Sequence, residues 1–449
     1  MRKPAAQTQN NPPQPPASVI HAFELLGKYF ALDVPGGSVH SLDAAAYKVV
    51  RGLGSPPGPT PPPGLSRDER EAWAELFALR RAGLLFTEDT VMPPPPPDTP
   101  LKAICLHVAH DCNLRCAYCF AEGGSFGAER GIMPPEVGIK AVDYLLSRCA
   151  SRRHLEIDFF GGEPLLAIDT VKSVVNYCNK HSAQTFRFTI TTNGLLLDED
   201  AIAFINATMD NVVLSLDGNR EVNDALRRTP EGEGSYDLAL PNFKRLLKDR
   251  KGDCFVRGTF TAAHPRFADS CEHLRQEGFT HISVEPAVLP PGHPLALTPG
   301  HLPGILDEYE RLAARLIQDP DFSFFHFQVD FEQGPCAHKR AKGCGAGYEY
   351  AAVTPSGNVY PCHQFVGNNN YLLGNVLDGT FDKGVSDVFR LLTAERKPSC
   401  SGCWAKYFCS GGCHASNLIA EGDLAKSYTL GCEMEKKRLE CAILLNATE

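Results

Sequence analysis

The sequence predicts an α/β protein whose central part is a parallel sheet that forms a barrel or part of one. Six short apolar runs recur between residues 101 and 290, and helix-length amphipathic segments separate them. Strand and helix alternate in this way when the sheet is parallel. The chain has 449 residues, more than one ordinary core needs, so we expect roughly two to four domains.

Composition and charge limit the class of protein. Acidic residues outnumber basic ones, 53 to 44, which gives a formal net charge of −9 and disfavours nucleic-acid binding. The N-terminus has no apolar core of the kind that a signal peptide requires, and no run approaches the roughly 20 apolar residues that span a bilayer. We therefore expect a cytoplasmic protein with no membrane partner, whose 17 cysteines serve metal or redox chemistry rather than disulfides.

Proline-rich stretches mark the first boundaries. Residues 1–17 are polar and rich in proline, and we predict a disordered tail there. Residues 18–90 form a separate unit, in which alternating apolar residues around "PGG" indicate a hairpin. Two helices should follow, the first capped by Asp43 and the second by the capping box Ser66-x-x-Glu69.

The rest of the chain divides into three parts. A polyproline linker covers residues 91–100, the strand–helix region covers 101–310, and a bridging and cysteine-rich region covers 311–449. Polar groups follow the apolar runs, at the edge where β/α barrels build their active sites. They are a cysteine loop, Gly161–Pro164, Thr192–Gly194, Ser215 with Asp217, and Glu285.

The cysteine loop, "HDCNLRCAYCF", spaces its thiols as Cys112-x3-Cys116-x2-Cys119. Three thiolates can hold three corners of a cubane [4Fe–4S] cluster and leave one iron open to a small molecule that chelates through an amine and a carboxylate. Zinc is one alternative, but a closed zinc site needs a fourth ligand, which His107 or His110 would have to supply. A purely structural group of buried thiols is another.

This loop resembles the signature of the radical S-adenosylmethionine (SAM) enzymes, in which an aromatic residue, here Tyr118, precedes the last cysteine. The resemblance implies a partial (β/α)6 barrel and a [4Fe–4S] cluster on Cys112, Cys116 and Cys119, where SAM is cleaved to a 5′-deoxyadenosyl radical. It also implies contacts to SAM from a wider set: Tyr118, Gly161, Gly162, Glu163, Pro164, Thr192, Asn193, Ser215, Asp217 and Arg227.

A second group of cysteines lies near the C-terminus, where residues 400–413 contain the spacing Cys-x2-Cys-x5-Cys-x3-Cys. The number of thiols suits two zinc ions or two cubanes equally well. The pattern, with Gly357-x4-Cys362 before it, resembles the SPASM extension of radical SAM enzymes, which carries two auxiliary [4Fe–4S] clusters. The resemblance assigns Cys344, Cys362 and Cys413 to the first cluster with Cys336 as its fourth ligand, and Cys400, Cys403, Cys409 and Cys432 to the second.

Six cysteines remain outside these groups. Most lie in predicted strands or helices and are expected to be buried apolar residues; Cys105 stands out because it lies on the first predicted strand, just before the cysteine loop. The six are Cys105, Cys149, Cys178, Cys254, Cys271 and Cys441.

Two longer stretches, "LHVAHDCNLRCAYCFAEGGSFGAERGIM" and "LEIDFFGGEPLL", resemble the maturases of SCIFF peptides, which are short, cysteine-rich precursors. The resemblance implies that residues 18–90 are a winged-helix-like recognition element that binds a leader peptide as an added strand; a docking domain without a ligand is the alternative. It implies thioether cross-links within the peptide, from a cysteine sulfur to a carbon of an acceptor residue, often threonine. An electron donor such as ferredoxin or flavodoxin is the second expected partner.

Two other functions stay open at this point. A different SPASM enzyme, such as an anaerobic sulfatase maturase, would oxidise a serine or cysteine to formylglycine; the predicted leader-binding unit argues against it. An iron–sulfur electron carrier or a zinc-ribbon scaffold would lack a SAM pocket, and Glu163 would then be dispensable.

Overall fold

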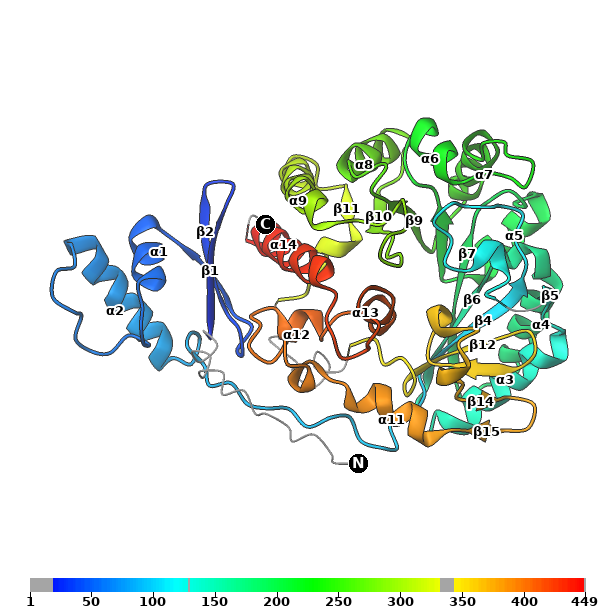
Figure 1. Cartoon of the computed structure of the whole chain (residues 1–449), viewed down its shortest axis with the longest axis horizontal. Helices are drawn as coiled ribbons and strands as arrows, with labels where there is room; N and C mark the ends of the chain where they lie inside the picture. The colour runs from blue at the N-terminus through cyan, green and yellow to red at the C-terminus, as the bar shows by residue number, and fades with distance from the viewer. Residues whose placement is uncertain (1–18, 128–129, 332–342, 448–449) are drawn as a thin grey trace, which may run out of the picture.

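The computed structural model describes residues 19–127, 130–331 and 343–447 (Figure 1). The predicted N-terminal tail and Cys336 lie outside these residues. No helix in the described ranges is long and apolar enough to cross a membrane.

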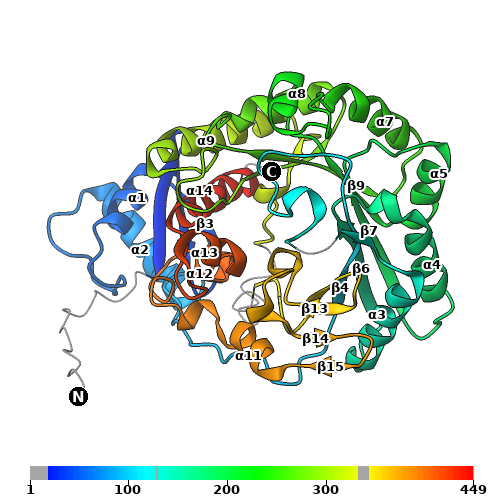
Figure 2. The same cartoon turned by 45° about the vertical axis from the view of Figure 1, so that its right-hand side comes forward.

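The six apolar runs form six parallel strands that neighbour one another in chain order, as the sequence predicts. Helices on the outer side of the curved sheet separate them, which Figure 2 shows as an arc around the strands. The strands are β4 (Ala103–His110), β6 (His154–Gly161), β7 (Thr185–Thr192), β8 (Asn211–Ser215), β9 (Asp253–Phe260) and β10 (His281–Pro286). The helices are α3 (Pro135–Arg148), α4 (Ile168–Cys178), α5 (Glu199–Thr208), α6 (Arg220–Leu226), α7 (Tyr236–Lys248) and α8 (Phe267–Gln276).

The same sheet continues beyond the six strands at both ends. At one end β11 (Ser323–Phe324) pairs with β10, and at the other β12 (Tyr350–Val353) pairs in parallel with β4. An antiparallel meander follows β12, and a short strand also pairs with the end of β4. These strands are β13 (Asn358–Tyr360), β14 (Gly374–Asn375), β15 (Thr380–Phe381) and β5 (Gly131–Ile132). The cysteine-rich region is therefore joined to the barrel through backbone hydrogen bonds.

The C-terminal helices lie on the open side of the arc (Figure 2). The last helix packs along α9 (Leu302–Ile317), and its C-terminal half is buried in the main core. The helices are α11 (Lys383–Leu391), α12 (Lys406–Cys409), α13 (His414–Glu421) and α14 (Thr429–Asn446).

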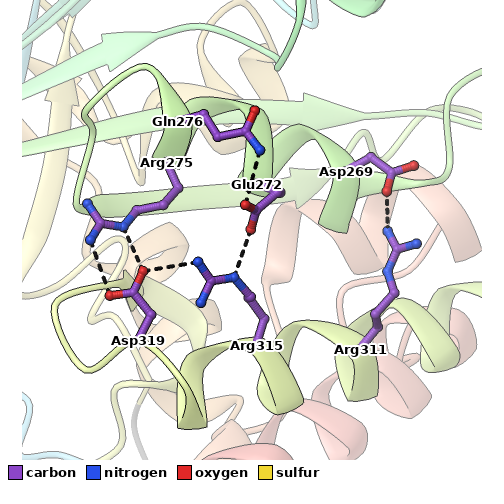
Figure 3. A network of polar contacts seen from close by, with 7 residues as sticks. All are labelled: Asp269, Glu272, Arg275, Gln276, Arg311, Arg315 and Asp319. Atoms are coloured by element: carbon purple, nitrogen blue, oxygen red, sulfur yellow. Dashed lines mark hydrogen bonds and ion pairs between the residues drawn. The ribbon is translucent and has the colours of Figure 1, made fainter.

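A network of ion pairs fixes α9 against α8 (Figure 3). Arg275 contacts both carboxylate oxygens of Asp319, at 3.0 and 3.2 Å, and Arg315 bridges Asp319 and Glu272 at 3.2 and 3.0 Å. Arg311 pairs with Asp269 at 2.6 Å. Because α9 in turn carries α14, this network supports the helix that closes the arc.

The N-terminal unit is an antiparallel sheet of three strands followed by two helices. They are β1 (Ile20–Leu25), β2 (Lys28–Asp33), β3 (Val39–Leu42), α1 (Ala44–Arg51) and α2 (Arg67–Arg81). Both predicted caps are confirmed: the Asp43 carboxylate accepts from the Ala46 amide at 2.7 Å, and Ser66 and Glu69 form the capping box.

The sheet of this unit is covered on both faces. Phe23 and Phe30 belong to the main core of the molecule, whereas Ile20 and Ala31 pack in a separate core with α1 and α2. This division arises because successive side chains along a strand point to opposite faces of the sheet. The unit is thus attached to α14 through an apolar face rather than through a linker alone.

Every cysteine among the described residues is a free thiol. Five of the six cysteines outside the proposed ligand groups are buried, and Cys254 is half-buried. This agrees with the expectation that they act as small apolar residues.

Candidate active site

A cavity of about 640 Å³ opens at the carboxyl ends of the parallel strands, between the cysteine loop and the C-terminal helices. Most of the residues predicted to bind the cluster or SAM line this one cavity. Those residues are Cys112, Cys116, Cys119, Tyr118, Gly161, Gly162, Glu163, Thr192, Asn193, Ser215 and Arg227. Pro164 and Asp217 are buried and lie outside the lining.

The cysteine loop is held by backbone hydrogen bonds to a distant segment. The Arg115 amide donates to the Arg228 carbonyl at 2.6 Å, and the Ala117 amide donates to the Leu226 carbonyl at 2.8 Å. Burial raises the pKa of Cys112 to about 12 and that of Cys116 to about 11. These thiols are therefore protonated at neutral pH unless a bound metal takes the proton's place.

Two glycines bring the turn after β6 against the start of the loop. Gly161 has a φ of +132°, and a Cβ there would lie 2.2 Å from the Ala109 carbonyl oxygen. A Cβ on Gly162 would lie 2.1 Å from the carbonyl oxygen of Asp111. The Glu163 amide donates to the same Asp111 oxygen at 2.9 Å. Only glycine permits this approach, which explains why both positions carry glycine.

Glu163 is fully buried beside the loop. Its Oε1 accepts from the Thr192 hydroxyl at 2.8 Å, and its Oε2 accepts from the Asn193 amide at 2.8 Å. Asn193 in turn donates through Nδ2 to Asn113 Oδ1 at 2.7 Å. Burial raises the pKa of Glu163, and these donors oppose the rise. The arrangement places a hydrogen-bonded carboxylate at the cavity, where it can attract an ammonium group.

Tyr118, Asp217 and Arg227 come from three segments and contact one another. The Tyr118 hydroxyl donates to Asp217 Oδ2 at 2.7 Å and accepts from Arg227 Nη1 at 2.8 Å. The other oxygen of Asp217 accepts from the Thr259 amide at 2.9 Å. In this structure Asp217 therefore anchors the loop through Tyr118. Direct contact of these three residues with SAM stays a prediction.

The C-terminal cysteines fall into two spatial groups. A smaller cavity of about 60 Å³ has four of them in its lining: Cys400, Cys403, Cys409 and Cys432. Cys344 and Cys413 line the large cavity but not the smaller one, whereas Cys409 and Cys432 line both. The thiols of Cys344 and Cys413 lie close enough to Cys362 to raise its pKa, which burial and these neighbours bring to about 12. This grouping is the one that the SPASM resemblance implies, although ligation by these cysteines stays a prediction.

The cysteine loop supplies the kind of ligand that iron–sulfur clusters use, because such clusters are held by cysteine thiolates. Three half-buried thiols on one loop beside an open cavity fit a cluster with one exposed iron.

Arg257, Glu285 and His326 form a charged group on the cavity wall, of which the sequence analysis identified only Glu285. Arg257 Nη2 donates to Glu285 Oε2 at 2.7 Å, and His326 Nε2 lies 3.5 Å from Glu285 Oε1. Burial raises the pKa of Glu285, but Arg257 and His326 outweigh it and bring the value to about 2. In the sequence, Arg257 could be noticed as a charged residue inside an apolar run. Arg438, which lines the cavity from α14, has no comparable feature in the sequence.

Comparison with known families agrees with this geometry. Residues 106–290 match the model of the radical SAM superfamily. Residues 344–404 match the model of SPASM, an iron–sulfur cluster-binding domain. The chain contains a radical SAM domain and a SPASM domain. These domains imply SAM and iron–sulfur clusters as cofactors; the number of three clusters stays a prediction.

Curated relatives align with most of the chain. A cysteine-type anaerobic sulfatase-maturating enzyme from Clostridium novyi (strain NT) is 24% identical over 326 residues, which cover 68% of this chain and 85% of that protein. The mycofactocin maturase MftC from Mycolicibacterium smegmatis is 27% identical over 337 residues, covering 70% and 79%. Thioether formation and closeness to the SCIFF-peptide maturases stay predictions.

Solved structures share the fold. Native anSMEcpe with bound AdoMet has a TM-score of 0.65 and 22% identity, covering 78% of this chain and 99% of that one. SuiB from Streptococcus suis bound to S-adenosylmethionine has a TM-score of 0.54 and 16% identity, covering 93% and 100%. The radical SAM and SPASM domains thus share their fold with these proteins, whereas the winged-helix assignment of residues 18–90 stays a prediction.

Proposed function

We propose that the chain is a radical SAM maturase of a ribosomally made, cysteine-rich peptide, in which it forms thioether cross-links from cysteine sulfur to an acceptor-residue carbon, often of threonine. One observation carries this proposal. The three thiols of the cysteine loop share a single cavity with four C-terminal cysteines, Cys344, Cys409, Cys413 and Cys432. A peptide in that cavity lies beside the cysteine loop and beside cysteines of both proposed auxiliary clusters, which a simple electron carrier does not require.

Each part of the site has a proposed role. Cys112, Cys116 and Cys119 hold a [4Fe–4S] cluster, and Glu163 accepts a hydrogen bond from the amino group of SAM. Together, cluster and SAM supply a 5′-deoxyadenosyl radical, which can remove hydrogen from an unactivated C–H bond. Tyr118 keeps the loop in place through its two hydrogen bonds, and the cavity walls orient the peptide and exclude water.

The N-terminal sheet is the proposed leader-binding site. Among the described residues, no strand pairs with the outer edge of β1 or of β3. The Asp33 amide donates to the Ser38 carbonyl at 2.9 Å, so the alternating ladder turns the Ser41 amide outward. An extended leader can add to such an edge. Structures of SuiB bound to the precursor peptide SuiA and of anSMEcpe with the Cp18Cys peptide support a peptide substrate.

The anaerobic sulfatase maturase is the second candidate. The likeness to the Clostridium novyi enzyme and the fold of anSMEcpe favour it. Its product, formylglycine, is an aldehyde: a serine side chain loses two hydrogens and keeps its oxygen, whereas a cysteine side chain exchanges its sulfur for oxygen, and no cross-link forms in either case. Under either proposal we expect a cytoplasmic enzyme that takes electrons from a ferredoxin or flavodoxin.

The mass of a precursor peptide decides between them. A cysteine-rich precursor is incubated anaerobically with the reconstituted enzyme, SAM and a reductant. Loss of two hydrogens per cross-link, with that cysteine closed to alkylation, supports the thioether maturase. Loss of sulfur from one cysteine supports the sulfatase-type reaction. An unchanged peptide alongside 5′-deoxyadenosine would contradict this substrate and keep only the radical SAM assignment.

A further inference from the structure

Lys397 is a buried lysine for which the structure offers no carboxylate partner. Its side chain is fully buried, and its Nζ donates to the Gly411 carbonyl oxygen at 2.7 Å. None of the ion pairs among the described residues includes it. Lys406 shows the usual alternative, because it is also buried but pairs with Asp89 at 2.6 Å. A buried ammonium without an anion is strongly unfavourable, and burial lowers the pKa of Lys397. Negative charge from another source is therefore what would keep this side chain protonated.

The carbonyl that Lys397 contacts belongs to Gly411, which lies between Cys409 and Cys413 in the chain and lines the smaller cavity with Cys400, Cys409 and Cys432. Burial lowers the pKa of Lys397, and negative charge on Cys400, Cys409, Cys413 and Cys432 opposes that lowering. Three of these cysteines belong to the group around the smaller cavity, and Cys413 belongs to the group that includes Cys344 and Cys362. The Lys397 ammonium therefore contacts the loop that links the two cysteine groups.

The backbone fixes the position of this lysine. The Cys400 amide donates to the Lys397 carbonyl at 2.9 Å, which ties the residue to the first cysteine of the 400–413 segment. Gly411 adopts a φ of +85°, and a Cβ there would lie 3.3 Å from Lys397 Cδ. The Lys397 side chain thus packs along the loop between Cys409 and Cys413, and its Nζ donates to the Gly411 carbonyl of that loop.

We propose that Lys397 is the counter-charge of the two auxiliary clusters and raises the reduction potential of at least the cluster held by Cys400, Cys403, Cys409 and Cys432. The inference rests on the cofactors assigned under the proposed function. A cubane with four thiolates carries net negative charge, and reduction adds one more. A fixed cation nearby stabilises the reduced state more than the oxidised state, and net charge is one of the factors that set cluster potentials. Lys397 is a positioning residue, since it touches neither substrate nor SAM.

The test measures potentials rather than turnover. Reconstituted holoenzyme carrying Lys397→Met or Lys397→Arg is titrated with a reductant, and the clusters are followed by electron paramagnetic resonance. We expect Lys397→Met to shift an auxiliary-cluster potential to more negative values and Lys397→Arg to stay near the wild type. Lys436→Met is the matched control, because that lysine also lies near Cys403 and Cys432 but is 31% exposed and pairs with Glu433 at 2.7 Å. Solvent screens it, so its loss should shift the potential far less.

Each outcome has a definite meaning. An unchanged potential in Lys397→Met, with all clusters present, overturns the inference and leaves the proposed function intact. Loss of an auxiliary cluster in Lys397→Met but not in Lys397→Arg supports the need for the charge. Loss in both variants overturns it, because shape rather than charge is then required. A wild-type protein that binds only one cluster would instead overturn the proposed cofactor set.

Discussion

At the scale of single residues, Glu163 is the group on which SAM binding should depend most. Three donors converge on its buried carboxylate, from the Thr192 hydroxyl and the amides of Leu165 and Asn193. Glu163→Gln removes the charge and turns an NH2 group towards one of these donors. A hydrogen bond to a charged group contributes about 1.5–3 kcal/mol, so we expect SAM affinity to fall roughly 10- to 100-fold, measured by isothermal titration calorimetry.

Thr192→Val is the control for this prediction. It removes one donor to Glu163 but keeps the carboxylate and its charge, so the loss of SAM affinity should be clearly smaller. Equal SAM affinity in wild type and Glu163→Gln would contradict the proposed role of Glu163. An electron carrier without a SAM pocket would instead bind SAM in neither protein.

The sequence could identify these residues but not their partners. Tyr118, Asp217 and Arg227 were each expected at SAM because their positions match a family pattern, and that contact stays a prediction. The hydrogen bonds that join the three residues to one another could not be read from the sequence. A linear pattern records which residue types recur, whereas the choice between a ligand and a neighbouring side chain depends on three-dimensional distances. The contact of Glu163 with SAM also stays a prediction; what the structure adds is that the Gly-Gly pair before it permits a close approach to the loop.

At the scale of elements, the outer edge of β3 is the simplest place to test leader binding. Ser41→Pro removes an amide that points away from β2, so it should spare the sheet but prevent an added strand from pairing there. We expect precursor affinity to fall roughly tenfold or more in a fluorescence anisotropy titration. Proline cannot donate the backbone hydrogen bond, and its ring obstructs an added strand. Uncoupled SAM cleavage should be unaffected.

Ser41→Thr keeps the amide and serves as the control. Glu24→Pro makes the equivalent change on the outer edge of β1, whose partner on the inner side is Tyr29 of β2. Full precursor affinity in both proline variants would rule out strand addition. Deleting residues 1–90 would be a poorer test, because Phe23 and Phe30 pack in the main core and their loss would expose an apolar surface.

The elements also show how far local patterns reach. The six barrel strands were predicted because each is an apolar run of ordinary strand length between helical segments. β12 (Tyr350–Val353) was not, since it is short and pairs with β4, which lies more than 200 residues earlier in the chain. That pairing brings the SPASM cysteines to the barrel, so the most consequential contact for the site was the least visible in the sequence.

At the scale of the whole molecule, α14 connects three parts that the proline-rich stretches appeared to separate. Its Glu440 accepts from His21 of β1 at 3.0 Å, its Arg438 lines the large cavity, and its Cys432 lines the smaller one. His21 also stacks on Trp404 at 3.6 Å between ring centroids. Proline marks where the backbone is stiff and extended, but only packing decides which surfaces are then buried together. The sheet of the proposed leader site and the large cavity therefore both contact α14.

The metal content of the whole chain gives the last prediction. If the cysteine loop and the SPASM groups bind separate clusters, replacing Cys112, Cys116 and Cys119 together by alanine should lower the iron from about 12 to about 8 atoms per chain. SAM cleavage should be abolished, because no open iron remains near Glu163. Iron is measured by colorimetric assay and cleavage by chromatography of 5′-deoxyadenosine. Cys254→Ser, in a half-buried cysteine outside all three groups, should keep both. Retained cleavage in the triple variant would mean that the loop does not hold the cluster on which SAM reacts.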